Sequence, residues 1–190
     1  MTDRIPTLDP RVARTHQALR DALITLTIER GWDALNVQQV CARAGVGRST
    51  FYVHFADNED LLLSGFHRDH VAPPAARARN AFGFFRPLIE HVSEYRTLYQ
   101  ALVGTRCEPA VRRRFARVVS ELVEAEVPRA AHHELQRTAA VRYLTGACTE
   151  TLTWWLDQPK PQAAAEIERC LRQLSAGALA QLRPYESAPR

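Results

Sequence analysis

Several features that mark other classes of protein are missing from this chain of 190 residues. No apolar run is long enough to span a bilayer, and residues Met1 to Asp9 lack the positive and then apolar regions of a signal peptide. We therefore expect a cytoplasmic protein with no membrane association. The sequence also has no Gly-x-Ser-x-Gly motif and no glycine-rich phosphate loop, so we expect neither an enzyme nor a cofactor.

The four cysteines lie far apart, and none belongs to a Cys-x-x-Cys pair. They are Cys41, Cys107, Cys148 and Cys170. This spacing argues against a zinc site and fits reduced thiols, although a redox-sensing cysteine stays open as an alternative. His67 and His70 have the spacing that places two imidazoles on one helix face, but no third ligand follows at a set spacing. We therefore expect no metal.

The net charge of +4 says little about partners, because the basic excess lies in the C-terminal two thirds of the chain. The arginine run over 112–117 is typical of a solvated helix face, which we favour over a second nucleic-acid surface. Local charge is more informative. No acidic residue lies between Asp33 and Asp57, whereas Arg43 and Arg48 do, and this favours an anionic partner for that segment.

The segment Leu35 to Phe55 has the pattern of two short helices around a glycine turn. Asn36 and Gln39 have the spacing of a capping box, which predicts the start of the first helix. Gly45 is suited to the positive φ that ends a helix, and the connection after it has the length used in helix-turn-helix units. The segment therefore predicts a helix-turn-helix that binds duplex DNA.

The second helix of this segment should begin after Gly47 and present two faces. Phe51 and Phe55 lie four positions apart, which predicts that they anchor one face on the core. The first turn of such a helix meets base edges, so Arg48 is the expected base reader, through two hydrogen bonds to guanine O6 and N7. Four further residues of this helix are expected to contact bases or phosphates: Ser49, Thr50, Tyr52 and His54.

The run Ala42 to Phe55 closely resembles the DNA-binding domain of the TetR family of transcriptional regulators. The resemblance extends to Glu59, Asp60 and Leu61 after the run and to the upstream helix that ends at Gly31, so it covers about the first third of the chain. Several motifs occur together at the family's spacing, which makes the resemblance specific. It implies a sequence-specific DNA-binding regulator, most often a repressor.

Two positions depart from the family pattern. The family usually has serine or threonine where Gly47 opens the second helix, and glycine caps almost as well. It usually has a backbone-contacting lysine where this chain has Asn58, so we expect one neutral phosphate contact and a shallower salt dependence of binding. Together the residues and the resemblance give these expected DNA contacts: Arg14, Val37, Gln38, Gly47, Arg48, Ser49, Thr50, Tyr52, His54 and Asn58.

Helical spacing of apolar residues continues through the rest of the chain, and no alternation typical of strands appears. Prolines and glycines predict a helix over 10–30, one starting at Asp57, one from Pro87 to Gly104, and three more before the C-terminus. We therefore expect an all-α fold of about nine helices. A three-helix helix-turn-helix domain over 1–71 should join a helical ligand-sensing and dimerisation domain over 72–190 near Pro73.

Two apolar stripes near the C-terminus are the expected dimer interface. They comprise Leu144, Cys148, Leu152 and Trp155, and then Ile167, Leu171, Leu174 and Ala178. The resemblance implies that these helices form a four-helix bundle with a second copy, which places two recognition helices about 34 to 36 Å apart on successive major grooves. Packing within one chain is the alternative explanation of the same stripes.

The resemblance also implies a small apolar or amphipathic effector that is held among the central helices and releases the regulator from its operator. The candidate lining residues are Phe84, His91, Tyr95, Tyr99, Phe115, Tyr143, Thr151 and Trp154. Aromatic residues at helical spacing are more often part of a core, so each is only a candidate. The alternative function is a helix-turn-helix regulator whose C-terminal domain binds a protein partner or senses redox state through cysteine.

Overall fold

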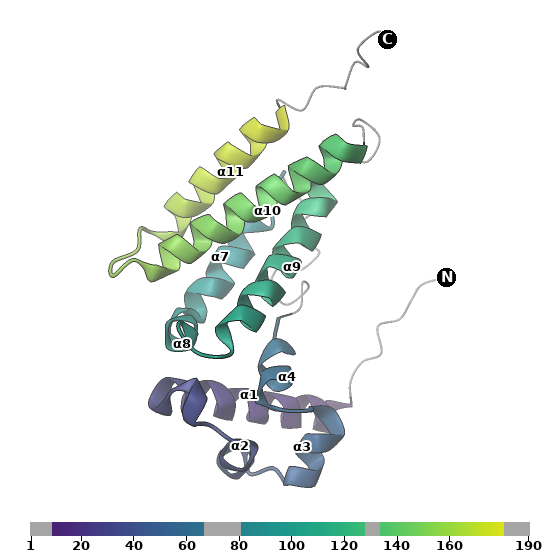
Figure 1. Ribbon diagram of the computed structural model, residues 1–190, viewed down its shortest axis with the longest axis vertical. Coiled ribbons are helices and arrows are strands. Elements are labelled where there is room, and N and C mark those ends of the chain that lie inside the picture. The colour runs from purple at the N-terminus through teal and green to yellow at the C-terminus, as the bar shows by residue number, and fades with distance from the viewer. Residues whose placement is uncertain (1–8, 67–80, 128–133, 181–190) are drawn as a thin grey trace. The chain divides into compact units, whose positions relative to one another are not determined.

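The computed structural model describes residues 9–66, 81–127 and 134–180. Within these ranges the chain forms nine α-helices, one short 3-10 helix and no strand (Figure 1), which confirms the predicted all-α fold. None of these helices is long and apolar enough to cross a membrane. The chain divides into two compact units, Met1–Gly65 with Ala101–Glu108, and Phe66–Gln100 with Pro109–Arg190. The predicted joint near Pro73 falls outside the described residues.

The first unit is built on the long helix α1 (Pro10–Arg30). Three short helices pack against α1: η1 (Trp32–Ala34), α2 (Val37–Ala44) and α4 (Asn58–Leu63). Helix α3 (Arg48–His54) packs on α2. The Asp9 carboxylate caps α1 by accepting a 2.8 Å hydrogen bond from the backbone N–H of Arg11. Leu19, Leu23 and Leu26 form the buried stripe of α1. The helix ends at Gly31, whose φ of +79° is a conformation that glycine adopts without cost.

The second unit contains α7 (Phe85–Glu94), α9 (Glu108–Glu126), α10 (Glu134–Asp157) and α11 (Ala164–Ala180), with α8 (Arg96–Leu102) ending in the first unit. Helix α11 packs against both α7 and α10, as Figure 1 shows.

The prediction of a single helix from Pro87 to Gly104 is wrong, because the helix breaks at Tyr95. The break turns α8 so that Arg96 Nε and Gln100 Nε2 donate to the Leu156 carbonyl oxygen at 3.0 and 3.2 Å. These bonds satisfy a carbonyl that the end of α10 leaves free.

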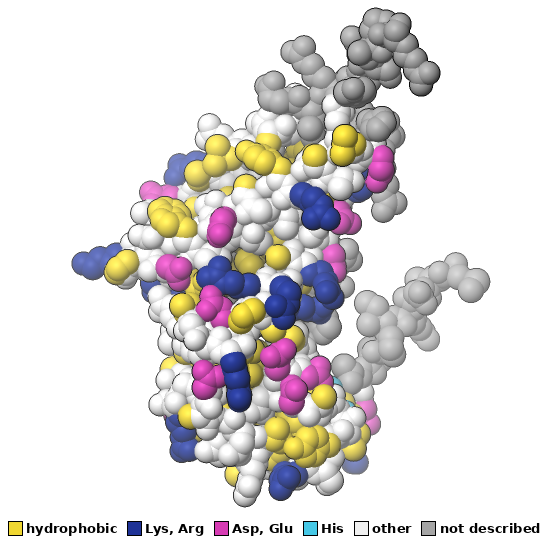
Figure 2. All heavy atoms as spheres, in the orientation of Figure 1, with side chains coloured by type: hydrophobic (Ala, Val, Ile, Leu, Met, Phe, Trp, Pro, Cys, Tyr) yellow, Lys and Arg dark blue, Asp and Glu magenta, His cyan; other side chains and the backbone are white. Residues whose placement is uncertain are grey.

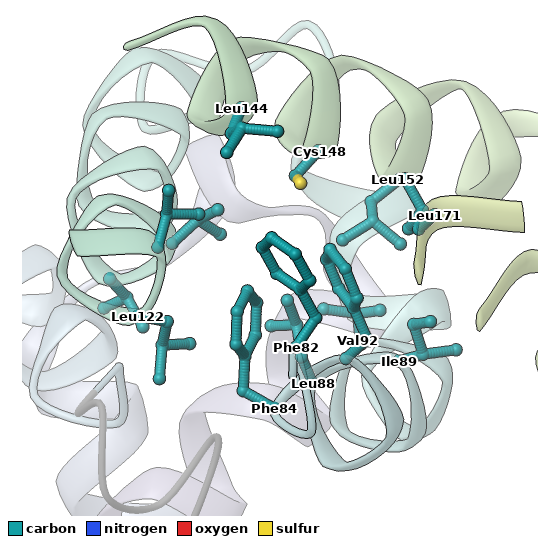
Figure 3. Packing of buried hydrophobic residues seen from close by; sticks show 14 of the residues in the cluster. Phe82, Phe84, Leu88, Ile89, Val92, Leu122, Leu144, Cys148, Leu152 and Leu171 are labelled. Atoms are coloured by element: carbon teal, nitrogen blue, oxygen red, sulfur yellow. The ribbon is translucent and has the colours of Figure 1, made fainter. Parts of the chain in front are cut away.

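The core of the second unit is formed by the buried faces of α7, α9, α10 and α11. Figure 3 shows the rings of Phe82 and Phe84 pointing toward Leu144 and Cys148 of α10. Phe82 is buried although its φ is +56°, an uncommon value for a bulky residue, and its N–H donates to Glu126 Oε2 at 3.0 Å. The aromatic segment before α7 is thus held at both its side chains and its backbone.

Candidate nucleic-acid interface

Helix α2 begins with the predicted capping box. The Gln39 N–H donates to Asn36 Oδ1 at 3.0 Å, and the Asn36 N–H donates to Gln39 Oε1 at 2.9 Å. Two backbone donors that the helix start leaves free are satisfied in this way. An exposed ion pair between Arg43 Nη2 and Glu29 Oε1, 3.2 Å long, joins α2 to α1.

The turn between α2 and α3 is built around Gly45, which has the left-handed φ of +65° that the sequence predicts. The Val46 N–H donates to the Cys41 carbonyl oxygen at 3.0 Å, and the Gly45 N–H donates to Ala42 at 3.4 Å. This pair of bonds is a Schellman motif, which ends a helix and redirects the chain. Gly47 then opens α3 without a side-chain hydrogen bond.

Helix α3 presents two different faces, as predicted. Phe51 and Phe55 are buried, with ring centroids 5.8 Å apart. Ser49 and Val53 lie four positions apart on the opposite face, and Val53 is 76% exposed. Figure 2 shows hydrophobic and basic side chains together on the surface at the position of α3. Helix α3 therefore leaves its outer face exposed while its inner face packs in the core.

The structure brings half of the expected DNA contacts to one open pocket of about 490 Å³ in the first unit. The predicted residues that line this pocket are Val37, Gln38, Arg48, Tyr52 and Asn58. Asn58 is half-buried, and its Oδ1 accepts no hydrogen bond from any described residue. We call this site the head pocket.

The other expected DNA contacts lie around the head pocket or on α1. Gly47, Ser49 and Thr50 are exposed at the start of α3, and Arg14 is exposed on α1. His54 is half-buried and packs on His16 of α1, with ring centroids 4.7 Å apart. His54 therefore also has a packing role, which the sequence pattern did not reveal.

Two exposed residues of the first unit were not predicted. Val53 follows Tyr52 on the outer face of α3, and the apolar character of that position in an otherwise polar surface helix is the signal that identifies it. Arg106 belongs to the segment between α8 and α9, yet it lines the head pocket beside Asn58. No local pattern connects Arg106 to the helix-turn-helix, because only the folded chain brings these segments together.

The buried cysteines are poorly suited to redox sensing. Burial raises the pKa of Cys41, and it raises the pKa values of Cys107 and Cys148 to about 12. The reactive thiolate is therefore scarce at neutral pH in these three side chains. Cys170 is the exposed cysteine.

No group of three or more His, Cys, Asp or Glu side chains within 9–66, 81–127 and 134–180 is arranged to hold a metal ion. His67 and His70 lie outside these ranges.

The predicted dimer stripes lie mostly inside the protomer. Six of the eight residues belong to the buried core of the second unit: Leu144, Cys148, Leu152, Trp155, Ile167 and Leu171. These side chains are buried within the protomer and have almost no surface to offer a second copy, so packing within one chain accounts for their burial. Leu174, which is 65% exposed, and the half-buried Ala178 keep accessible surface.

The predicted ligand-lining residues fall into three groups. Phe84 is fully buried in the core, and Tyr99 and Phe115 pack against that core while partly buried. His91 and Tyr95 lie ring to ring, 4.8 Å between centroids, at the end of α7, and Thr151 is half-buried on α10. Tyr143 and Trp154 are 67% and 52% exposed on α10, so they lie on the outer surface of the protomer.

Comparison with protein families gives two separate matches. Residues 19–64 match the family described as "Bacterial regulatory proteins, tetR family". Residues 79–177 match the family described as "Transcriptional regulator C-terminal region". The first match contains the helix-turn-helix, and the second spans α7 to most of α11.

Curated relatives match this chain only over short stretches. The chain is 37% identical over 49 residues to "Uncharacterized HTH-type transcriptional regulator YwcC" and 32% identical over 57 residues to the similarly described YdeS, both from Bacillus subtilis (strain 168). These matches cover 26% and 30% of this chain and only 22% and 29% of the two relatives. The aligned region is thus less than a third of each relative's length.

Solved structures share the fold over most of the chain. A TetR transcriptional regulator from Streptococcus agalactiae 2603V gives a TM-score of 0.63 at 21% identity, covering 87% of this chain and 95% of that one. The dihydroxyacetone kinase operon activator DhaS gives 0.66 at 17% identity, covering 88% and 96%. NalD of Pseudomonas aeruginosa, the secondary repressor of the MexAB-OprM multidrug efflux pump, gives 0.62 at 19% identity, covering 88% and 97%.

Proposed function

Because the chain belongs to the TetR family of bacterial regulatory proteins and is a DNA-binding transcriptional regulator, we propose that it represses transcription from an operator and that a small molecule releases it. The main support for DNA binding is the way in which α3 is placed. Its first turn is exposed, while Phe51 and Phe55 hold the helix on the core. Such a helix enters the major groove with its N-terminal residues first. Action on an operator places the protein in the cytoplasm.

Arg48 is the proposed base reader. It is exposed in the first turn of α3 and lines the head pocket, so its guanidinium is available for two hydrogen bonds to one guanine. Gln38 and Tyr52 lie around the same pocket and suit contacts to phosphate oxygens, which fix the position of the protein but carry no sequence information.

The test begins with the duplex that the wild-type protein enriches from a random-sequence pool. Arg48→Ala should weaken binding to that duplex by about 1 to 3 kcal/mol and relax the preference at one base pair. Arg86→Ala is the matched control, because Arg86 is an exposed arginine of α7 that pairs with Glu90 in the second unit. Equal affinities of the two variants across all single-base changes of the duplex would contradict the role of Arg48.

Repression is the direction of regulation that we propose, although proteins with this fold include both a repressor and an activator. NalD is described as a repressor and DhaS as an activator, and the two share this fold to a similar degree. A reporter gene placed behind the selected duplex distinguishes them. Repression predicts lower reporter output with the wild-type protein than with Arg48→Ala, whereas activation predicts the reverse order.

We propose that the effector binds in the second unit beside Tyr99 and Phe115. Both side chains are partly buried against the core, so they combine apolar surface with access for a ligand. An effector acts only through its different affinities for the DNA-bound and free states. A panel of apolar and amphipathic compounds should therefore contain members that lower the affinity for the selected duplex, and Tyr99→Ala should reduce that response without changing binding in the absence of compound.

A further inference from the structure

The segment between α8 and α9 presents Arg106 from a fixed backbone in the DNA-binding unit. Leu102 and Cys107, on either side of it, are 2% and 0% exposed and belong to this unit. The Gly104 N–H donates to Glu108 Oε2 at 2.6 Å, and the Thr105 N–H donates to the Leu102 carbonyl oxygen at 3.1 Å. Arg106 itself is about 70% exposed. The loop is thus anchored while the guanidinium remains on the surface.

Arg106 shares the head pocket with residues of the DNA-reading surface. The pocket is lined by Arg48 and Tyr52 of α3, by Asn58 at the start of α4, and by Arg106. A phosphate that approaches this pocket meets an amide at Asn58 and a guanidinium at Arg106. Arginine forms two parallel hydrogen bonds with a phosphate, and its charge makes them strong.

Arg106 lies among acidic side chains, so it determines the local charge of this side of the pocket. Asp33 Oδ1 lies 3.3 Å from Arg106 Nε, and Asp57 and Glu59 line the head pocket. All three carboxylates contribute to the raised pKa of the neighbouring Cys107, after burial, whereas Arg106 acts in the opposite direction. With Arg106 removed, this side of the pocket would be acidic and would repel the DNA backbone.

We propose that Arg106 binds a backbone phosphate of the operator at the rim of the head pocket and supplies the cationic contact that Asn58 cannot make. The proposal rests on the proposed DNA-reading role of this surface. The ion pair with Asp33 does not prevent it, because both partners are more than half exposed and such pairs are weak and easily exchanged. The DNA contact surface therefore includes a residue from outside the helix-turn-helix.

The test measures how binding to the selected duplex depends on salt. Each phosphate contact contributes about 0.9 to the slope of log affinity against log salt. Arg106→Gln should therefore lower the slope by about 0.9 for each bound protomer, whereas Arg86→Gln, which removes the same charge from α7, should leave it unchanged. For two bound protomers, raising salt from 50 to 200 mM should weaken wild-type binding about tenfold more than binding by the variant.

A second variant distinguishes a phosphate contact from a structural role. Asn58→Lys places a cation in the same pocket, so it should restore the slope when it is combined with Arg106→Gln. An unchanged slope in Arg106→Gln, or a lower affinity at all salt concentrations with no change in slope, would overturn the proposal. Wild-type protein that enriches no duplex at all would instead overturn the proposed function, so the two failures are distinguishable.

Discussion

His16 of α1 meets His54 of α3 edge to face, with ring centroids 4.7 Å apart, and also contacts the Phe55 ring at 4.8 Å. Burial lowers the pKa of His16 below the ordinary value of 6.5, and the nearby charges of His54 and Arg20 lower it further. Its Nε2 is buried and has no hydrogen-bond partner among the described residues. A proton on His16 is therefore unfavourable in the folded DNA-binding unit.

This environment makes stability depend on pH in a definite direction. As pH falls below 6.5, the unfolded chain takes up a proton at His16 more readily than the folded chain, so the free energy of unfolding decreases. Well above that pH both states are neutral at His16 and the full stability remains. We expect the wild-type unfolding temperature to drop between pH 7.5 and 5.5, and to drop less in His16→Asn. Equal drops in the two proteins would show that His16 has no such effect.

At the scale of elements, the helix-turn-helix is the part of the fold that its own residues determine most completely. The capping box at Asn36, the left-handed Gly45 and the Phe51–Phe55 pair are all confirmed. Each involves residues no more than five positions apart, so the sequence pattern contains both partners of every interaction. The exposed face of α3 follows from the buried one, because the two faces of a helix have fixed positions relative to each other.

The sequence pattern did not predict the features of the fold that depend on contacts between distant parts of the chain. The break at Tyr95 leads to a helix that bonds to the end of α10, some sixty positions along the chain. Arg106 likewise lines the head pocket beside residues that lie some fifty positions or more before it in the sequence. The stripe from Leu144 to Trp155 was correctly identified as apolar, but periodicity shows which face is covered and not what covers it. The covering partner turned out to be the protomer itself.

Substitutions at Gly45 test how much the stability of the helix-turn-helix depends on the backbone conformation of its turn. Its φ of +65° is accessible to glycine, less so to asparagine, and costs other L-residues about 1 to 2 kcal/mol. A Cβ at this position would meet nothing within 4 Å, so any loss in a variant reflects the backbone and not a clash. Gly45→Ala should therefore lower the free energy of unfolding by about 1 to 2 kcal/mol, and Gly45→Asn by less. Chemical denaturation measures both, and equal losses would contradict the explanation.

At the scale of the whole molecule, the outer faces of α10 and α11 suit a second copy of the chain. Gly146 and Gly177 lie inside these helices, where glycine costs about 0.5 to 1 kcal/mol relative to alanine. A Cβ at either position would meet nothing within 4 Å, so packing within the protomer does not require glycine there. Tyr143 and Leu174 are exposed on the same two helices. Figure 2 shows hydrophobic side chains spread along the surface of this pair.

We therefore propose that the homodimer forms through this outer surface, with the glycines allowing close approach of the partner helices. The sequence-based interface instead used the buried faces of the same helices. A symmetric dimer presents two copies of α3 to one face of a duplex, with centres about 34 to 36 Å apart. The repeat in the operator should match that spacing.

Gly146→Leu tests this interface without disturbing the protomer. Leucine is a better helix former than glycine, and open space surrounds the position, so the free energy of unfolding of an isolated protomer should not decrease. In the dimer the same side chain would occupy the space of the partner helix, so the dissociation constant should rise by at least tenfold. Sedimentation equilibrium at micromolar concentration measures it, and Ala125→Leu at an exposed position of α9 is the control. A wild-type monomer would remove the dimer, whereas a Gly146→Leu dimer as tight as the control would place the interface on another face.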